Sequence, residues 1–221
     1  MLRKRLEMVS KMVRKGVSVV DIGTDHAYLP IYLVEKGICA RAVAADVVPG
    51  PLRNAQKNIA LHHLEDKIQT RLSDGLDGLA PEDGDDFIFA GMGGTLIVEL
   101  LERTEWIRDP AKRFIIQPMT HGEDVRRFLC SNGFEILRED VCEDSGRLYI
   151  ALCAEYTGRV TEHPASFYYT GKLTECLKGE ARLYLSRQTE RLSKAIDALE
   201  KSGGSDPELR KAVDQMKRSS F

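Results

Sequence analysis

Residues 17–25 read Val-Ser-Val-Val-Asp-Ile-Gly-Thr-Asp, a short apolar run that ends in an acid, a glycine and a polar turn. A second apolar run, Ala-Val-Ala-Ala at residues 42–45, is closed by Asp46. Continuous apolar runs of this kind are typical of buried parallel strands, and the carboxyl ends of such strands are where an open α/β sheet binds ligands. Two neighbouring strands that each end in a carboxylate predict a site for a hydroxyl-rich nucleoside cofactor.

The composition indicates a packed protein rather than a disordered or membrane-spanning one. The chain has 221 residues, of which 43% are hydrophobic and 30% charged, enough for one α/β domain and an appendage. It contains no apolar run of 18 residues, and its N-terminus lacks the apolar core of a signal peptide. Its five cysteines are widely spaced, without a Cys-x-x-Cys pair. We therefore expect a cytoplasmic protein with no membrane contact, no disulfide framework and no metal site.

The two ends of the chain are basic. Residues 1–16 carry six Lys or Arg against one acid, and residues 171–221 carry eleven against eight. This distribution favours a polyanionic partner that touches the ends. The alternative is a solvated helix face, which is the commoner origin of such a charge run in either segment taken alone.

The apolar periodicity, with its glycine and proline boundaries, predicts alternating strands and helices. Helices are expected over about 2–15, 30–36, 51–62, 95–103 and 123–131, with Leu52, Ala55, Ile59 and Leu61 as the buried set of the third. Strands are expected over about 17–22, 41–46, 68–72, 86–90, 113–116, 134–142 and 147–156.

The last two strands flank Glu143-Asp144-Ser145-Gly146 and should form an antiparallel hairpin. The expected fold is therefore α/β, a doubly wound Rossmann-like sheet of the methyltransferase type that ends in an antiparallel hairpin. Residues 157–170 suggest a boundary, which gives a domain over 1–158 and a helical tail over 159–221. An apolar stripe from Leu173 through Leu177 to Leu199, the break at 202–205 and the helix start at Asp206 predict a coiled-coil hairpin of one long and one short arm.

The first turn, Asp21-x-Gly23-x-Asp25, favours one cofactor class over another. It lacks the three glycines of a dinucleotide fingerprint, and Asp25 would repel a phosphate. S-adenosylmethionine has no phosphate and carries a sulfonium and an ammonium, which carboxylates attract. The alternative is that Asp21 and Asp25 only cap the following helix.

Three further positions extend this hypothesis. Asp46 can accept hydrogen bonds from both ribose hydroxyls, and Asp74, followed by Gly75, can accept one from the adenine amino group. The glycine-rich turn at residues 91–94 would allow a bulky acceptor to approach closely. Each has an ordinary structural alternative: a strand-end acid, an Asp-Gly turn and a tight strand–helix turn. Tyr28 could stack on a base or face a methyl acceptor, although a lone tyrosine near a helix start is more often core packing.

The decapeptide at residues 21–30, Asp-Ile-Gly-Thr-Asp-His-Ala-Tyr-Leu-Pro, resembles the signature of the bacterial tRNA (adenine(22)-N1)-methyltransferase family. Three other pieces support the resemblance, and together they cover about residues 1–155: Asp46-Val47 with Pro51-Leu52-x-x-Ala55-x-x-Asn58-Ile59, Gly91-Met92-Gly93-Gly94, and Gln117-Pro118-Met119. The resemblance implies methyl transfer from S-adenosylmethionine to N1 of an adenine in the tRNA D-arm. It also implies a coiled-coil domain that helps to hold tRNA.

The resemblance also implies roles for particular residues. Asp25 and Tyr28 are expected beside the target base as catalytic residues, and Asn58 and Gly93 near the substrate. The cofactor site is expected to comprise Asp21, Gly23, Thr24, Asp25, His26, Asp46, Val47, Asp74, Gly75, Gly91 and Met92. The basic residues expected to hold the tRNA backbone are Arg3, Lys4, Arg5, Lys11, Arg14 and Lys15 at the N-terminus and Lys172, Lys178, Arg182, Arg187 and Arg191 in the tail.

Two other functions remain open on the sequence. One keeps the cofactor and changes the acceptor to another RNA base or a small molecule, which the basic tail argues against. The other is a non-catalytic RNA-binding protein that keeps the fold. The expected partner is tRNA, and the protein is expected to be a monomer.

Overall fold

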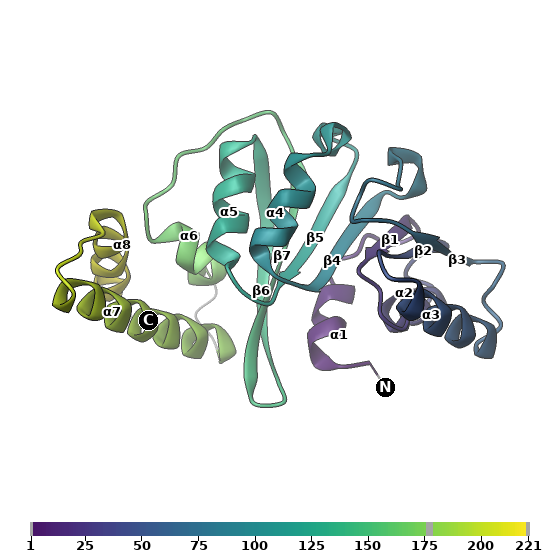
Figure 1. Cartoon of the computed structure of the whole chain (residues 1–221), viewed down its shortest axis with the longest axis horizontal. Helices are drawn as coiled ribbons and strands as arrows, with labels where there is room; N and C mark the ends of the chain where they lie inside the picture. The colour runs from purple at the N-terminus through teal and green to yellow at the C-terminus, as the bar shows by residue number, and fades with distance from the viewer. Residues whose placement is uncertain (1, 176–178, 220–221) are drawn as a thin grey trace.

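The computed structural model of this chain describes residues 2–175 and 179–219 (Figure 1). Leu177 and Lys178, assigned above to the tail stripe and to tRNA contact, lie outside the described residues. In chain order the elements are α1 (Lys4–Ser10), β1 (Ser18–Ile22), α2 (Tyr28–Glu35), β2 (Arg41–Asp46), α3 (Pro49–Leu61), β3 (Ile68–Leu72), η1 (Pro81–Asp83), β4 (Asp86–Met92), α4 (Gly94–Glu102), η2 (Glu105–Arg108), β5 (Arg113–Pro118), α5 (Gly122–Ser131), β6 (Phe134–Asp144), β7 (Arg147–Tyr156), α6 (Phe167–Thr170), η3 (Gly171–Glu175), α7 (Glu180–Lys201) and α8 (Pro207–Arg218).

The seven strands form one sheet in the order β3-β2-β1-β4-β5-β7-β6. Neighbours among the first five strands pair in parallel, whereas β7 runs antiparallel to both β5 and β6. The predicted doubly wound sheet with a terminal antiparallel hairpin is therefore confirmed. Because β7 is reversed, its first residues lie at the edge where β1, β2, β4 and β5 end.

Helices cover both faces of the sheet, and strand alternation decides which residues each face buries. One face packs Val20, Ile22, Phe87 and Phe89 against α4 and α5. The other packs Val19, Ala42, Ala44 and Ile88 against α1, α2 and α3. Asp21 lies on the second face, since it alternates with Val20 and Ile22.

The N-terminal helix is shorter than the predicted 2–15. It ends at Ser10, although Met12 and Val13 remain buried in the turns that follow. The backbone N–H of Arg14 donates to Oδ2 of Asp86 at 2.8 Å, and its Nε donates to Oδ1 at 2.7 Å. We attribute the early end of the helix to this buried carboxylate, which holds the chain at the start of β4.

In α3 the predicted buried residues Leu52, Ala55 and Ile59 are confirmed, but Leu61 is 77% exposed. Leu61 lies two residues after Ile59, a spacing that turns it away from the buried stripe.

The tail forms a hairpin of a long and a short helix, as predicted (Figure 1). Leu192, Ile196, Val213 and Met216 make a small core of its own. The side chain of Asp206 caps α8 by accepting from the N–H of Leu209 at 2.9 Å. The long arm α7 begins at Glu180, and Leu173, predicted to belong to its stripe, lies in η3.

The tail is attached to the sheet through a buried ion pair. Nη2 of Arg126 on α5 lies 2.8 Å from Oε2 of Glu139 on β6, and both side chains are at most 1% exposed. Nη1 of Arg126 donates to the carbonyl of Tyr168, and a Cβ on Gly171 would overlap Glu139. The segment expected to be a linker therefore packs closely against the core from Phe167 onward.

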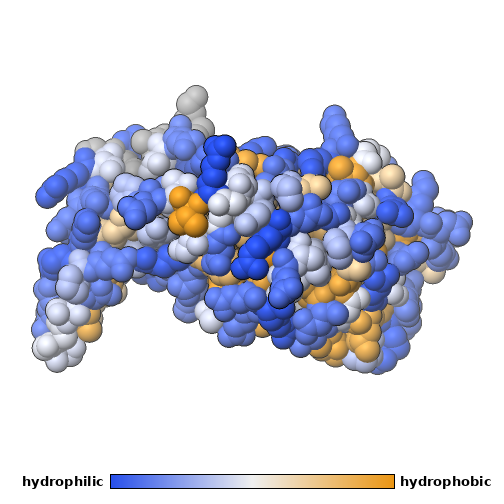
Figure 2. Space-filling model, turned by 90° about the horizontal axis from the view of Figure 1, so that it is seen from above, coloured by the Kyte–Doolittle hydropathy of each residue, from blue (hydrophilic) through white to orange (hydrophobic). Residues whose placement is uncertain are grey.

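Hydrophilic side chains predominate on the surface seen in Figure 2, with hydrophobic ones in separate patches. No helix of the described residues combines the length and the apolar character that a bilayer crossing requires.

Candidate active site

The predicted cofactor residues gather at the carboxyl edge of the sheet. Asp21 near the end of β1 is 6% exposed, and burial raises the pKa of its carboxyl to about 7. A hydrogen bond from the side chain of Thr24 and the charge of Arg5 lower that pKa, while the charge of Asp46 raises it further. The site thus contains a buried carboxyl group whose ionisation needs a cation nearby.

Gly23 makes the turn that follows β1. It has a φ of +77°, and its N–H donates to the carbonyl of Ala45 at 2.9 Å. The N–H of Thr24 donates to the same carbonyl at 2.9 Å. A Cβ on Gly23 would lie 3.3 Å from Sδ of Met92 at the end of β4. The exposed turn therefore leaves backbone open to solvent, and the structure brings Gly23 and Met92, two of the predicted cofactor residues, together.

Asp25, His26 and Tyr28 form an exposed group above this turn. Oδ2 of Asp25 lies 3.2 Å from Nε2 of His26, and the rings of His26 and Tyr28 stack with centroids 5.1 Å apart. Tyr28 is 56% exposed, so the alternative that it packs in the core is wrong. The capping alternative is also wrong, because the N-cap of α2 is Ala27 and α2 has no side-chain cap.

Asn58 supports the same loop through a hydrogen bond. Its Nδ2 donates to the carbonyl of His26 at 2.9 Å. Ala27 next to that carbonyl has a φ of +55°, a conformation that a non-glycine residue rarely adopts without support. Asn58, predicted near the substrate, therefore contacts the loop backbone and fixes the position of His26.

Asp46 ends β2 beside the first turn. Its Oδ1 accepts from the N–H of Val48 at 2.8 Å, and no described residue donates to its Oδ2. Val47 and Val48 are 56% and 50% exposed, so apolar surface lies uncovered next to this carboxylate. A free carboxylate oxygen beside an apolar patch matches the ribose and base of a nucleoside.

Asp74 and Gly75 lie in a turn, the structural alternative given for them above. Oδ1 of Asp74 lies 3.1 Å from Nη2 of Arg103, which also donates to the Asp74 carbonyl. Gly75 has a φ of +57°, and a Cβ there would overlap the side chain of Leu100. The turn thus needs a glycine for its backbone and its packing, and the Asp74 carboxylate already has a cationic partner.

The Gly91–Gly94 turn approaches both α1 and the β5–α5 turn. Gly91 sits at a β-bulge with a φ of +96°, and a Cβ there would lie 3.2 Å from Nη1 of Arg5. A Cβ on Gly94 would overlap the backbone of His121, and one on Gly93 would lie 3.4 Å from Oγ1 of Thr120. Close approach by the side chains of Arg5 and Thr120 and by the backbone of His121 is therefore one reason for these glycines.

Arg5, one of the basic residues predicted to contact tRNA, has its guanidinium inside the site, beside Gln117 and Gly91. Its Nη1 donates to Oε1 of Gln117 at 2.8 Å, and its Cζ lies 5.9 Å from the ring centroid of Tyr149. Neither Gln117 nor Tyr149 was among the site residues predicted from the sequence. The sequence signal that could have identified Gln117 is a polar residue at the end of the apolar strand 114–116; the structure shows that its side chain is fully buried.

The other basic residues differ in their surroundings. Arg3 and Arg182 are exposed, and Lys172 is half-buried. Arg14 was expected to contact tRNA, but it is held by Asp86 and by the carbonyls of Asp85 and Ala111, at the edge where the strands begin. The pair with the buried Asp86 carboxylate gives Arg14 a structural role, and its contact with tRNA stays a prediction.

The donor set fits S-adenosylmethionine. The buried carboxyl of Asp21 matches the positive charge of this cofactor. Gly23 has no side chain and allows the cofactor to approach the backbone closely. The carboxylate of Asp46, beside exposed apolar residues, matches the ribose and base of its nucleoside. Across the described residues no three His, Cys, Asp or Glu side chains form a group that could hold a metal ion.

Comparisons with known proteins agree with this geometry. Residues 2–152 match a family model described as a methyltransferase domain. The tRNA (adenine(22)-N(1))-methyltransferase of Bacillus subtilis is 31% identical over 193 residues, which cover 86% of this chain and 81% of that protein.

Two solved structures resemble the whole chain. One is a candidate tRNA (m1A22) methyltransferase of Streptococcus pneumoniae in complex with S-adenosyl-L-methionine, with a TM-score of 0.87, 33% identity and 100% of each chain covered. The other is the TrmK protein of M. capricolum in complex with S-adenosyl-homocysteine, with a TM-score of 0.79, 26% identity, and 99% of this chain and 97% of that one covered.

Proposed function

This chain belongs to the tRNA (adenine(22)-N1)-methyltransferase family, and we infer that it methylates N1 of adenine 22 in the D-arm of tRNA with S-adenosylmethionine as the donor. The observation that carries this inference is the pair of acids at the tips of neighbouring strands, the buried Asp21 and the half-free Asp46, separated by the turn at Gly23. A cationic nucleoside without a phosphate suits that arrangement.

We propose that the donor lies along this edge. Asp46 would hold the ribose through its free oxygen, Val47 would pack on the adenine, and Asp21 and Thr24 would face the charged end. Gly91 and Met92 would bound the side from which the acceptor arrives. S-adenosylmethionine supplies an electrophilic methyl group on a sulfonium.

The remaining task of the enzyme is alignment. N1 of adenine carries its own lone pair and needs no general base to attack in line, so positioning and electrostatic support supply most of the acceleration. The product is cationic at N1. The Asp25 carboxylate and the exposed face of Tyr28 would stabilise that charge, and Asn58 would hold the loop that carries them.

The target must first leave its stack, because N1 lies on the pairing edge of the base, and extrusion costs a few kcal/mol. We propose that residues 1–158 form the methyltransferase domain and that residues 159–221 help to hold the tRNA. The exposed Arg3 and Arg182 and the half-buried Lys172 would contact its backbone, which predicts salt-dependent binding. We place the enzyme in the cytoplasm, as a monomer that uses no metal, because N1 is nucleophilic without a Lewis acid.

The experiment uses two transcripts of one unmodified tRNA, with adenine or guanine at position 22, each incubated with the protein and labelled donor. Nucleoside mass spectrometry of the product should show 1-methyladenosine in the first transcript and no methylated nucleoside in the second. Equal labelling of both, or a methyl group at another atom, would overturn the assignment. Labelling of a small molecule in place of tRNA would support the rival acceptor.

A further inference from the structure

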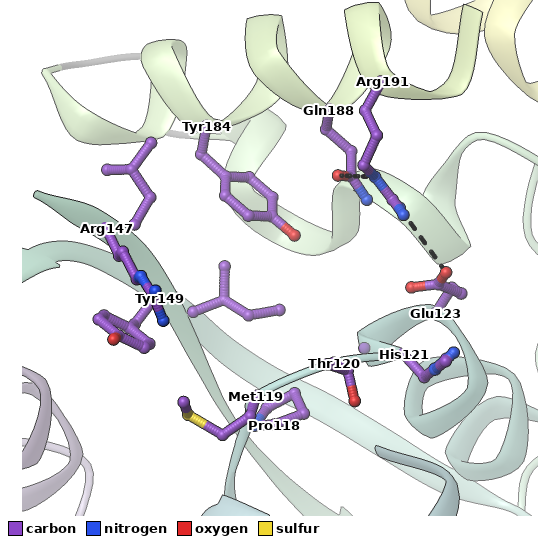
Figure 3. A pocket seen from close by; sticks show the side chains of 13 residues that line it. Pro118, Met119, Thr120, His121, Glu123, Arg147, Tyr149, Tyr184, Gln188 and Arg191 are labelled. Atoms are coloured by element: carbon purple, nitrogen blue, oxygen red, sulfur yellow. Dashed lines mark hydrogen bonds and ion pairs between the residues drawn. The ribbon is translucent and has the colours of Figure 1, made fainter. Parts of the chain in front are cut away.

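A cavity of about 390 Å³ lies between the sheet and the first half of α7 (Figure 3). Its walls are the turn from β5 to α5, the first residues of β7, and one face of α7. Because β7 begins where β5 ends, the cavity opens at the same edge of the sheet as Asp21 and Asp46. It is separate from the cofactor residues, which lie over β1, β2 and β4.

Two hydrogen bonds fix the cavity next to the Gly91–Gly94 turn. The N–H of Met119 donates to the carbonyl of Met92, and the N–H of Gly94 donates to the carbonyl of Thr120, both at 2.8 Å. The cavity therefore starts beyond β5, about one to two strand spacings, or ~5–10 Å, from the end of β4. This is the reach of one nucleotide along an unstacked backbone.

The lining brings together cations and aromatic rings from elements far apart in the sequence. Arg147 and Tyr149 come from β7, and Tyr184 and Arg191 from α7. Figure 3 shows Tyr184, Gln188 and Arg191 directed from α7 toward the β5–α5 turn. Arginine beside an aromatic face is the combination that holds the phosphate and the base of an unpaired nucleotide.

The two α7 side chains are held in place. Nε of Arg191 donates to Oε1 of Gln188 at 3.2 Å, and its Nη2 lies 3.7 Å from Oε1 of Glu123 on α5. Tyr184 packs with Ile150 and Leu173. Burial raises the pKa of its hydroxyl, and the nearby charge of Arg126 opposes that shift. Arg147 forms no ion pair with any described residue. A cavity with fixed walls and one free cation is suited to a specific anionic ligand.

We propose that this cavity holds a nucleotide that flanks the methylated adenine, with its phosphate between Arg147 and Arg191 and its base against the Tyr184 ring. The proposal rests on the proposed function. The target base itself belongs at the end of β4, beside Gly91 and Met92, on the acceptor side of the donor. Capturing a neighbour in the cavity offsets the free energy spent on unstacking the D-arm, and it gives the tail a direct part in exposing the base.

The test couples changes in the protein to changes in the tRNA. Wild-type enzyme, Tyr184→Leu and Arg191→Gln are assayed on an intact transcript and on transcripts with an abasic nucleotide at position 21 or at position 23. Lys194→Gln is the matched control, since Lys194 lies one turn further along α7, pairs with Glu190 and does not line the cavity. Calorimetry with S-adenosylhomocysteine reports the cofactor site of every variant.

We expect KM for intact tRNA to rise about tenfold in Tyr184→Leu and Arg191→Gln, with kcat changed less than threefold and cofactor affinity unchanged. One abasic position should raise KM for the wild type by a similar factor and add nothing in Tyr184→Leu. Lys194→Gln should behave as the wild type.

The inference is overturned if both abasic transcripts react like intact tRNA, or if the abasic penalty persists in full in Tyr184→Leu. Should Tyr184→Leu fail to fold, Arg191→Gln decides, because its side chain is 58% exposed: an unchanged KM then refutes the proposal. A wild-type enzyme that methylates no tRNA would refute the proposed function instead.

Discussion

Arg126 and Glu139 form a bidentate ion pair inside the protein, with Nε and Nη2 of the arginine both donating to the carboxylate. The carboxylate raises the pKa of Arg126, so the pair stays ionised although burial opposes charge there. Since Arg126 also holds the Tyr168 carbonyl, the pair joins α5, β6 and the start of the tail.

Removal of one partner should therefore be costly. Arg126→Met or Glu139→Gln alone should lower the free energy of unfolding by about 3–5 kcal/mol, because an unpaired charge or donor stays buried. The double variant Arg126→Met/Glu139→Leu should be less destabilised than either. Urea titration measures all three. The exposed pair Arg138–Asp140 is the control, and its removal should cost at most about 1 kcal/mol. Single variants as stable as that control would contradict the assignment.

Asp21 should make cofactor affinity depend on pH. Its pKa of about 7 means that the folded, unliganded enzyme holds a proton there in acid, whereas a cationic donor favours the carboxylate. Affinity for S-adenosylmethionine should therefore rise as pH increases from 6 to 8, and binding should release a proton near neutrality. Calorimetry in two buffers of different ionisation enthalpy detects that proton. Asp21→Asn should bind weakly at every pH in this range without proton release.

The same shift has a consequence for stability. In the unfolded chain this carboxyl ionises near 3.8, and in the folded protein near 7. The stabilising effect of the shift is complete below pH 4 and is lost as pH rises to 7, where the folded state must ionise a buried group. Asp21→Asn should therefore raise the free energy of unfolding at pH 8 relative to wild type, by roughly 2–4 kcal/mol. Thermal melts at pH 5 and pH 8 compare the two proteins, and a gain no larger at pH 8 would argue against the shift.

Asp46 should contribute to binding through its free oxygen. Asp46→Ala should weaken S-adenosylmethionine binding by about 1–3 kcal/mol, or roughly 5- to 150-fold in Kd, since a charge-assisted hydrogen bond to a ribose hydroxyl is lost. Asp66→Ala, at an exposed position before β3, is the matched control and should bind normally. Titration calorimetry checks both, and equal affinities would refute the ribose role.

Arg14 should matter for folding and not for tRNA. Arg14→Ala should cost about 2–3 kcal/mol of stability, because it leaves the fully buried Asp86 without its cation. The adjacent and exposed Lys15→Ala should cost almost nothing. Filter binding of labelled tRNA, scaled to the folded fraction, should give the same Kd for Arg14→Ala and wild type. A higher Kd for Arg14→Ala would indicate that Arg14 contacts tRNA.

The local pattern of apolar and turn-forming residues in the sequence determined the strands of the sheet. Strand cores such as 18–22 and 41–46, the hairpin turn at Ser145-Gly146 and the cap at Asp206 depend on apolar periodicity and on turn chemistry, which neighbouring residues decide. The edge that carries Asp21, Gly23 and Asp46 followed from those strands, because parallel strands end together. The residue roles proposed for cofactor and tRNA binding remain predictions.

Only the tertiary structure decided which partners the long side chains contact. Arg5 and Arg14 are equivalent members of one basic segment in the sequence, yet Arg5 turns into the site toward Gln117 and Arg14 pairs with Asp86 at the opposite edge. Asp74 meets Arg103, and Gly75 meets Leu100, across segments that no local pattern connects. The cavity between β7 and α7 likewise depends on contacts between distant segments, the buried ion pair of Arg126 with Glu139 and the apolar cluster of Ile150, Leu173 and Leu185. Contacts between distant segments depend on packing and charge compensation in three dimensions, whereas a strand or a turn is specified by its own few residues.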